Sequence, residues 1–474
     1  MTRPLSRRRF LQGAAGAGLL AAAGPKAFGR SSDDRLRLAV IGHLYNAGHF
    51  FSSIHGYEEV ELVAICDPEE KKIADVWKEW EKKVQAGDKA AAYYKRLLDH
   101  KPAAYSDFRK MFEAEKIDAV VVSVYDHLHG PICAAAMRAG KHVFSERPLG
   151  LRIREARALR ELAAKQKVAT SIRNPGNSYP VFRRGVELIR DGAIGPVEEV
   201  HVWFPRAGAG ATERPKGEEP VPEGLNWDAW LGPVAARPYH PKWMSYAEWR
   251  ETSNGGIGSF GTHAANLAYM ALRLRDLWDK PGATIKVKAE VPEINRLSFP
   301  RWEIIRWQVP ARGDLPPVRF TWHRGPEKTL SPGSRDKLEA LLRERGLPKE
   351  RFEAVFKEAG LLILGRDGAV VADSHNANVL FLPEEKFRET AKGGPKKLSA
   401  SKGHYKDWLL ACRGGEAPWA GFDYAGPFSE FLMLGNVATQ FDTELEYDPV
   451  AGKIVNSPEA DQLLGYDYRK GWTL

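Results

Sequence analysis

An acidic residue and a glycine turn near the start of the chain have the arrangement of a dinucleotide site. Asp67 ends the second apolar run of the 474-residue sequence, and Gly42 ends the first. A carboxylate at that place accepts hydrogen bonds from ribose hydroxyls, which favours NAD over NADP. The turn matches Gly-x-Gly-x-x-Gly poorly, because Leu44 and Ala47 stand where glycines are needed. The pattern predicts NAD (or NADP), tightly bound if present, with a fold that has lost this ligand as the alternative.

Polar and aromatic residues further along the chain have the chemistry of a sugar-binding site. Asn177 follows an apolar run at 168–172, where a pocket is expected to open, and ordinary turn chemistry is the alternative. His240 and Arg250 stand among tyrosine and tryptophan residues. Aromatic faces stack on sugar rings while polar tips bind hydroxyl groups. We therefore predict that Asn177, His240 and Arg250 contact the substrate.

The histidine and cysteine spacing does not indicate a metal site. His127 and His129 diverge on a helix at this separation, and no third ligand accompanies them. The three cysteines lie far apart, which excludes a cysteine-based zinc site and a disulfide-dense scaffold. We predict no metal.

Alternating strands and helices must position these residues. Buried strands are predicted at 36–42, 60–65, 118–124, 142–144 and 168–172, with helices at roughly 46–56, 69–85, 108–115, 131–139 and 154–164. Continuous apolar strands that alternate with helices indicate a parallel sheet covered on both faces. The predicted fold class is α/β, with an N-terminal Rossmann doubly wound parallel sheet over 35–175.

A substrate and oligomerisation domain is predicted over 176–474. Strands are expected at 200–204, 284–291, 304–309 and 318–323, helices at 181–191, 262–273, 403–413 and 428–440, and a charged helical surface insertion at 335–359. The long loops between them favour an α+β domain with an open, mostly antiparallel sheet. An open sheet face exposes apolar surface unless it is paired, so we predict a homodimer or homotetramer.

Residues 1–30 have the features of an export signal. Arg7, Arg8 and Arg9 precede Phe10-Leu11 and a short stretch rich in Ala and Gly, which is typical of the twin-arginine route. This predicts a periplasmic or extracytoplasmic protein that is exported folded. No segment reaches the roughly 20 apolar residues of a membrane span. Most of the formal net charge of +9 lies in the signal, so the near-balanced remainder does not indicate nucleic-acid binding.

Several motifs resemble the Gfo/Idh/MocA (glucose–fructose oxidoreductase / inositol dehydrogenase) family, in its exported twin-arginine branch. They lie at 126–129, 139–143, 146–148, 188–196, 227–233, 254–263 and 422–427. The similarity extends from about residue 35 over nearly the whole chain. It implies a Rossmann domain, an α/β domain with an open sheet, and NAD(P)-dependent oxidation or reduction of a sugar or polyol. The cofactor contacts that we predict are Gly42, Leu44, Tyr45, Asn46, Asp67, Tyr125, His129, Glu146 and Arg147.

The catalytic positions that the resemblance implies differ from the family pattern. A lysine that touches the reacting hydroxyl is replaced by Arg147, and an aspartate is replaced by Ser259, while His263 matches. A guanidinium stays charged, so it can polarise an oxygen but cannot pass on a proton. Ser259 would share the helix face of His263 if the helix reaches back that far, but it cannot stabilise an imidazolium as a carboxylate would. We predict that His263 takes a proton from the substrate hydroxyl while Arg147 polarises its oxygen, and that Ser259 and His263 contact the substrate.

Three functions are open at this point. The first is an exported nicotinamide-dependent oxidoreductase that acts on a hydroxyl or keto group of a sugar, polyol or derivative. The second is a glycosidase that uses tightly held NAD for transient oxidation. The third is a catalytically degenerate carbohydrate-binding relative, to which Leu44, Arg147 and Ser259 point.

Overall fold

The computed structural model describes residues 35–42, 50–51 and 53–474. The predicted export signal and the turn residues Leu44, Tyr45 and Asn46 lie outside these residues. Among the residues described, no helix is both long and apolar enough to cross a membrane.

The N-terminal domain is built on one parallel sheet with the order β3-β2-β1-β4-β5-β6. The strands are β1 (Leu36–Ile41), β2 (Val60–Cys66), β3 (Ala103–Tyr105), β4 (Ala119–Val122), β5 (His142–Ser145) and β6 (Thr170–Ile172). The central strand β4 is buried at every position, because helices cover both faces of the sheet. This confirms the doubly wound sheet. The short strand β3 is an addition that the sequence analysis did not predict.

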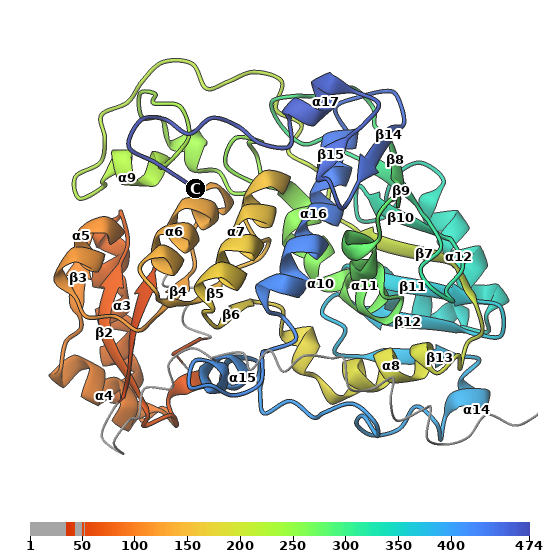
Figure 1. Cartoon of the computed structure of the whole chain (residues 1–474), viewed down its shortest axis with the longest axis horizontal. Helices are drawn as coiled ribbons and strands as arrows, with labels where there is room; N and C mark the ends of the chain where they lie inside the picture. The colour runs from red at the N-terminus through yellow and green to blue at the C-terminus, as the bar shows by residue number, and fades with distance from the viewer. Residues whose placement is uncertain (1–34, 43–49, 52) are drawn as a thin grey trace, which may run out of the picture.

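The helices that accompany this sheet (Figure 1) include α3 (Glu70–Gln85), α4 (Ala91–Asp99), α5 (Phe108–Ala114), α6 (Asp126–Arg138) and α7 (Ile153–Gln166). Helix α6 begins at Asp126, earlier than predicted, so the 126–129 motif forms its first turn. The strand order reverses between β1 and β4. In open α/β sheets, ligands bind at the carboxyl ends of the strands at such a reversal.

The second domain contains a mixed, mostly antiparallel sheet with the order β13-β12-β11-β7-β10-β9-β8-β14-β15. Its strands are β7 (Val197–Phe204), β8 (Ile285–Glu290), β9 (Glu303–Val309), β10 (Val318–Arg324), β11 (Gly360–Gly365), β12 (Ala369–Asp373), β13 (Val379–Leu382), β14 (Leu445–Asp448) and β15 (Lys453–Ile454). Strands β7 and β10 pair in parallel. The sheet confirms the predicted architecture, and β11 to β15 extend it beyond the strands that were predicted.

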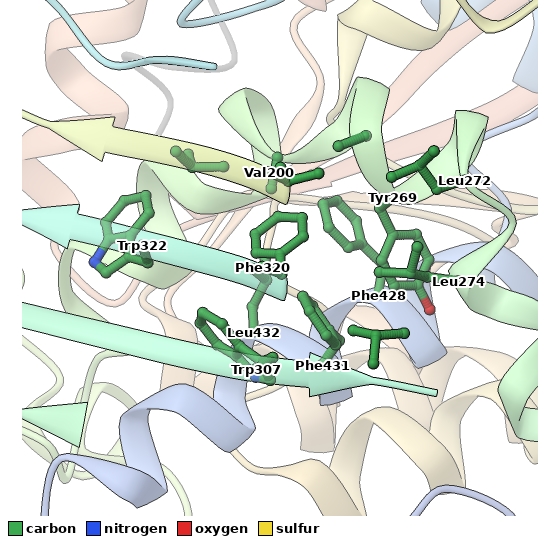
Figure 2. Packing of buried hydrophobic residues seen from close by; sticks show 14 of the residues in the cluster. Val200, Tyr269, Leu272, Leu274, Trp307, Phe320, Trp322, Phe428, Phe431 and Leu432 are labelled. Carbon is green, nitrogen blue, oxygen red and sulfur yellow. The ribbon is translucent and has the colours of Figure 1, made fainter. Parts of the chain in front are cut away.

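Aromatic and aliphatic side chains fill the space between this sheet and the helices on its inner face (Figure 2). The helices are α8 (Pro180–Arg190), α11 (Asn266–Ala271) and α16 (Phe422–Ala438). The ring of Phe431 stacks on Trp307, with centroids 5.0 Å apart, and Tyr269 lies 4.5 Å from Phe428. Helix α16 also packs on α7 of the first domain, so it ties the two sheets together.

The outer face of the second sheet does not expose the apolar surface that the oligomer prediction required. Helices α12 (Ser334–Glu344) and α13 (Phe352–Phe356) cover one half, where Leu338 and Phe356 are buried against Trp203. On the other half, charged side chains pair across strands, as Lys286 does with Glu446 at 3.0 Å. The reason given for a homo-oligomer is therefore wrong, because the 335–359 insertion and these ion pairs cover the face. The oligomeric state itself stays a prediction.

The C-terminal part of the chain packs against both sheets. In α15 (His404–Ala411), Trp408 is buried beside Phe144 of β5, with ring centroids 5.4 Å apart. Near the chain end, Trp472 packs on Phe108 and the Tyr468 hydroxyl donates to Glu155 at 2.6 Å. The division near residue 175 thus separates the two sheets along the chain, but residues beyond 403 also complete the first domain. The remaining helices are α9 (Trp227–Leu231), α10 (Thr262–Ala264), α14 (Glu384–Phe387) and α17 (Pro458–Gln462).

Candidate active site

The carboxyl ends of β1 and β2 provide two of the predicted cofactor contacts. Gly42 has φ +76°, and a Cβ atom there would lie 2.3 Å from the Val124 side chain and 2.6 Å from the Ser123 carbonyl oxygen. Only glycine allows the backbone of β1 to pass so close to the end of β4. Asp67 is buried at the end of β2, and its Oδ1 accepts the N–H of Glu69 at 2.9 Å. A glycine turn and a carboxylate at these places fit a bound NAD.

A long loop of the second domain lies over this end of the first sheet (Figure 1). The N–H of Asn226 donates to the Pro68 carbonyl at 2.7 Å, and that of Glu70 donates to Gly224 at 2.9 Å. Tyr125, at the start of α6, donates its hydroxyl hydrogen to the Met244 carbonyl at 3.2 Å. Asp67 and Tyr125 are thereby brought together under one loop, and their contact with a cofactor stays a prediction.

His129, a predicted cofactor contact, is hydrogen-bonded to the protein through both ring nitrogens. Its Nδ1 lies 2.9 Å from the Pro148 carbonyl oxygen, its Nε2 lies 3.2 Å from that of Val124, and the side chain is buried. The imidazole therefore links the ends of β4 and β5, and neither ring nitrogen is left for a cofactor. His127 is likewise buried between the carbonyl groups of Trp230 and Thr252, and burial lowers its pKa to about 4. Within the described residues, no group of histidine, cysteine and acidic side chains is arranged to hold a metal ion.

Arg147 forms the centre of a buried polar cluster at the end of β5. Its Nη1 donates to Glu146 Oε2 at 3.1 Å, and its Nε donates to His263 Nε2 at 3.1 Å. The second oxygen of Glu146 accepts from Arg173 Nη1 at 3.3 Å. The structure thus brings Glu146, Arg147 and His263 together, as the two motifs predicted. Nη2 of Arg147 has no hydrogen-bond partner among the described residues.

The hydrogen bonds of His263 determine its tautomer. Arginine can only donate, so Nε2 of His263 accepts and the hydrogen resides on Nδ1, which lies 3.4 Å from Asn174 Oδ1. Burial, and then the charge of Arg147, hold the pKa of His263 well below its ordinary value. The imidazole is therefore neutral, and its basic lone pair is already engaged by Arg147.

Ser259 lies in a segment that is not a regular α-helix leading to His263. The segment Ile257–Gly261 is a π-helix, whose wider turn changes which side chains share a face. The hydroxyl of Ser259 bonds to the Gly255 carbonyl at 2.8 Å and to the Tyr246 hydroxyl at 2.9 Å. The condition for a shared face, an α-helix that reaches back from His263 to Ser259, is therefore not met, and a contact of Ser259 with substrate stays a prediction.

Glycine explains how this segment reaches the first domain. A Cβ atom on Gly258 would lie 3.3 Å from the ring of Pro148 and 2.3 Å from Asn254. The side chain of Asn254 donates to the Gly150 carbonyl at 3.1 Å. The glycine-rich turn therefore packs the His263 segment directly on the Glu146-Arg147-Pro148 motif.

The three further substrate contacts that were predicted have different environments. Asn177 lies in the turn Pro175–Ser178 after β6, buried beside Asn266, and its Nδ2 has no partner among the described residues. His240 accepts the N–H of Lys242 at 3.2 Å, and its other described partner is Glu219. Substrate contacts of Asn177 and His240 stay predictions.

Arg250 makes structural contacts between distant segments, and its contact with substrate stays a prediction. It is 5% exposed, and its guanidinium donates to the carbonyl groups of Asn295, Ser298 and Asn436 and to the Thr439 hydroxyl, at 2.7–3.2 Å. These contacts join the 295–298 loop to the end of α16. Burial lowers the pKa of Arg250 to about 9.

Two histidines that the sequence analysis did not predict also lie at the site. His375, in the loop between β12 and β13, stacks on His263 with ring centroids 4.5 Å apart. His404, at the start of α15, accepts the N–H of Asn174 at 3.1 Å. Both lie more than a hundred residues from His263 in sequence, so no local spacing could have identified them.

The geometry defines a Rossmann-type site at the strand-order reversal, and comparison with known proteins agrees. Residues 36–173 match the family model described as "Oxidoreductase family, NAD-binding Rossmann fold" (GFO_IDH_MocA). The match covers less than a third of the chain, and it makes NAD the cofactor class of the first domain. The match supports the expected Gfo/Idh/MocA family for the first domain.

Individual relatives are similar over part of the chain. An uncharacterised oxidoreductase of Schizosaccharomyces pombe is 29% identical over 134 residues, which are 28% of this chain and 35% of the relative. Glycosyl hydrolase family 109 protein 1 of a Shewanella species is 28% identical over 168 residues, which are 34% of each protein. The chain thus matches about a third of the length of these relatives.

A solved structure shows that the fold extends beyond the first domain. The inositol dehydrogenase homologue of Azotobacter vinelandii, complexed with NADH and myo-inositol, superimposes with a TM-score of 0.51 at 17% identity. The superposition covers 88% of this chain and 98% of the other. It supports the two-domain fold.

Proposed function

We propose that this chain is an exported NAD(H)-dependent oxidoreductase that acts on a hydroxyl or keto group of a sugar, polyol or derivative. The observation that carries the proposal is the position of Arg147. Its guanidinium is held between Glu146 and His263 at the carboxyl end of β5, where the second domain meets the crevice side of the Rossmann sheet. The NAD-binding family match supports it.

The described residues have separate roles in such a reaction. When bound, the nicotinamide would accept or supply a hydride at the substrate carbon. Arg147 holds a permanent positive charge beside the reacting oxygen, and its Nη2 is left to donate to that oxygen. Glu146 and His263 fix the orientation of the guanidinium, because they accept from Nη1 and Nε. Asp67 and Gly42 provide the ribose and phosphate-turn positions.

The first experiment is the dinucleotide content of the protein. The precursor is purified from cytoplasm under native conditions and denatured, and its supernatant is analysed for nicotinamide dinucleotides. We expect stoichiometric NAD(H), followed by nicotinamide reduction with at least one member of a sugar and polyol panel. Absence of dinucleotide, with no thermal shift when it is added, would instead favour the degenerate carbohydrate-binding protein.

A glycosidase that uses held NAD for transient oxidation is the second candidate. The match to a glycosyl hydrolase family 109 protein favours it. This activity needs no net change in the cofactor, which suits a protein without an external NAD supply. It predicts release of the leaving group from an aryl glycoside without added NAD. The oxidoreductase predicts nicotinamide reduction and no release.

Export is part of the proposal and is supported by Arg7-Arg8 ahead of Phe10-Leu11. Cell fractionation tests it: the protein is expected outside the cytoplasm, and Arg7→Lys/Arg8→Lys is expected to retain it inside. An unchanged distribution of the double variant would contradict the twin-arginine route.

A further inference from the structure

We propose that His375, and not His263, is the proton acceptor for the substrate hydroxyl, and that Glu358 and Ser374 position it for this role. The inference deepens the proposed oxidoreductase function and rests on it. It starts from the hydrogen bonds around the two stacked imidazoles, whose ring centroids are 4.5 Å apart with an interplanar angle of 31°.

His263 has no free basic nitrogen. Its Nε2 accepts from Arg147 Nε at 3.1 Å, and its Nδ1 faces Asn174 Oδ1 at 3.4 Å. The amide of Asn174 is oriented by donation from its Nδ2 to the Thr262 carbonyl at 2.7 Å, so its oxygen must accept from His263. With 3% of its surface exposed, His263 would have to displace Arg147 to take a proton from substrate.

His375 has the opposite arrangement. Ser374 lies 2.8 Å from Nδ1 of His375 and donates to Glu358 Oε2 at 3.2 Å. A carboxylate can only accept, and the serine hydroxyl has one hydrogen, so His375 must donate from Nδ1 to Ser374. The lone pair therefore resides on Nε2, which has no hydrogen-bond partner among the described residues. The side chain is partly exposed, whereas His263 is buried.

The loop that carries His375 is held rigidly against the His263 segment. Asp373 accepts the N–H groups of Ala377 and Asn378 at 2.8 and 3.1 Å, which closes the turn. The side chain of Asn376 accepts the N–H of Leu267 at 3.1 Å and donates to the Ala264 carbonyl at 3.4 Å. The imidazole is therefore positioned by the fold before substrate binds, as a catalytic group must be.

Burial and the charged groups around His375 keep its imidazole neutral. Burial, Arg147 and Arg173 lower its pKa, while Asp373 and Glu358 raise it, and the net direction is downward. His263, stacked on it, is neutral as well. A neutral imidazole beside a guanidinium that stabilises the developing alkoxide is suited to remove the hydroxyl proton.

The step balances as an alcohol oxidation. The O–H bond would break and its proton would pass to Nε2 of His375. The oxidised nicotinamide, when bound, would supply the acceptor for the hydride that the C–H bond releases, and a C=O bond would form. His375 then returns the proton to solvent at its exposed edge. The products are a carbonyl compound, reduced dinucleotide and one proton.

The test uses the full chain with its bound dinucleotide and the substrate that the wild-type enzyme turns over. For His375→Gln we expect kcat to fall about 100-fold or more, with KM and dinucleotide content unchanged. His375→Ala is expected to regain activity when imidazole is added, which a purely structural histidine would not show. The exposed His100→Gln, at the end of α4, is the matched control and should behave as wild type.

Glu358→Gln tests the positioning role. Loss of the Glu358 charge removes an interaction that raises the pKa of His375, so the acidic limb of the kcat/KM profile should move to lower pH. Ser374→Ala should lower kcat, because Nδ1 of His375 loses its hydrogen-bond acceptor, and it should not shift the acidic limb as Glu358→Gln does. An unshifted profile for Glu358→Gln would remove Glu358 from the proposal.

The outcomes separate the two proposals. Full activity of His375→Gln with loss of activity in His263→Gln would assign the base to His263 and overturn the inference, while the oxidoreductase function would stand. A wild-type protein with neither dinucleotide nor turnover would overturn both. If His375→Gln does not fold, the imidazole response of His375→Ala and the profile of Glu358→Gln decide the question.

Discussion

At the scale of single residues, Arg147 determines the chemistry available to its neighbours. Its permanent charge lies beside His263 and between two hydrogen-bond acceptors, one of them the carboxylate of Glu146. A lysine at this place could release a proton, but a guanidinium cannot. Under the proposed function, proton transfer would therefore fall to a different group, and residue 147 would provide charge stabilisation.

Replacing Arg147 should raise the pKa of His263. In Arg147→Met the positive charge that opposes protonation is lost, although burial still lowers the pKa, so the proton affinity of His263 should rise about tenfold or more. Glu146 keeps Arg173 as a partner. The measurement is an NMR titration of ¹³C-labelled histidines, with His263→Asn to assign the signal. An unchanged titration would show that Arg147 does not act on His263 in solution.

At the scale of elements, helix α12 covers the outer face of the second sheet, which a partner subunit was expected to cover. Its buried Leu338 and Leu342 lie over the outer face of the second sheet. We expect Leu338→Asp to detach the helix, because a carboxylate cannot stay in that apolar contact, and to lower the free energy of unfolding by about 3 kcal/mol or more. Ala340→Asp, on the exposed side of the same helix, is the control.

The readouts are urea unfolding and light scattering. The newly exposed face of Leu338→Asp should cause association that increases with protein concentration. Equal stability of the two variants would mean that α12 does not cover the sheet as described.

At the scale of the whole molecule, buried neutral histidines should make the fold sensitive to acid. Burial lowers the pKa of His127 to about 4 and that of His404 to about 3, and the pKa values of His201, His263 and His323 are also lowered. The unfolded chain binds protons at these residues near pH 6.5 and the native chain does not. Stability is therefore present above about pH 6.5 and falls as the pH decreases, by up to roughly 1.4 kcal/mol per pH unit for each histidine.

Urea unfolding between pH 8 and pH 5 measures this effect, above the range in which most carboxylates titrate. His127→Asn should reduce the slope, because one proton-binding difference between the native and unfolded chains is lost. A free energy of unfolding that is constant over this range would contradict the buried neutral state of these residues.

The sequence by itself determined the Rossmann sheet and the meeting of two motifs. Strand β4 is a continuous apolar run and β1 and β2 are mostly apolar, as expected where both faces of a parallel sheet are covered. The motifs at 146–148 and 254–263 predicted that Arg147 and His263 belong to one site. Gly42 and Asp67 stand at strand ends, so their place at one edge of the sheet followed from the strand pattern alone.

Only the tertiary structure decided which nitrogen of each histidine is free and which arginine is structural. Arg250 has the residue type of a sugar contact, but four acceptors from distant segments enclose it. His375 shows no local motif, and the strand pairing of β11, β12 and β13 brings it onto His263. Periodicity reports which face of an element is buried, whereas hydrogen-bond partners far apart in the chain are determined by packing. The assignment of base and positioning residues therefore depended on contacts that no local pattern encodes.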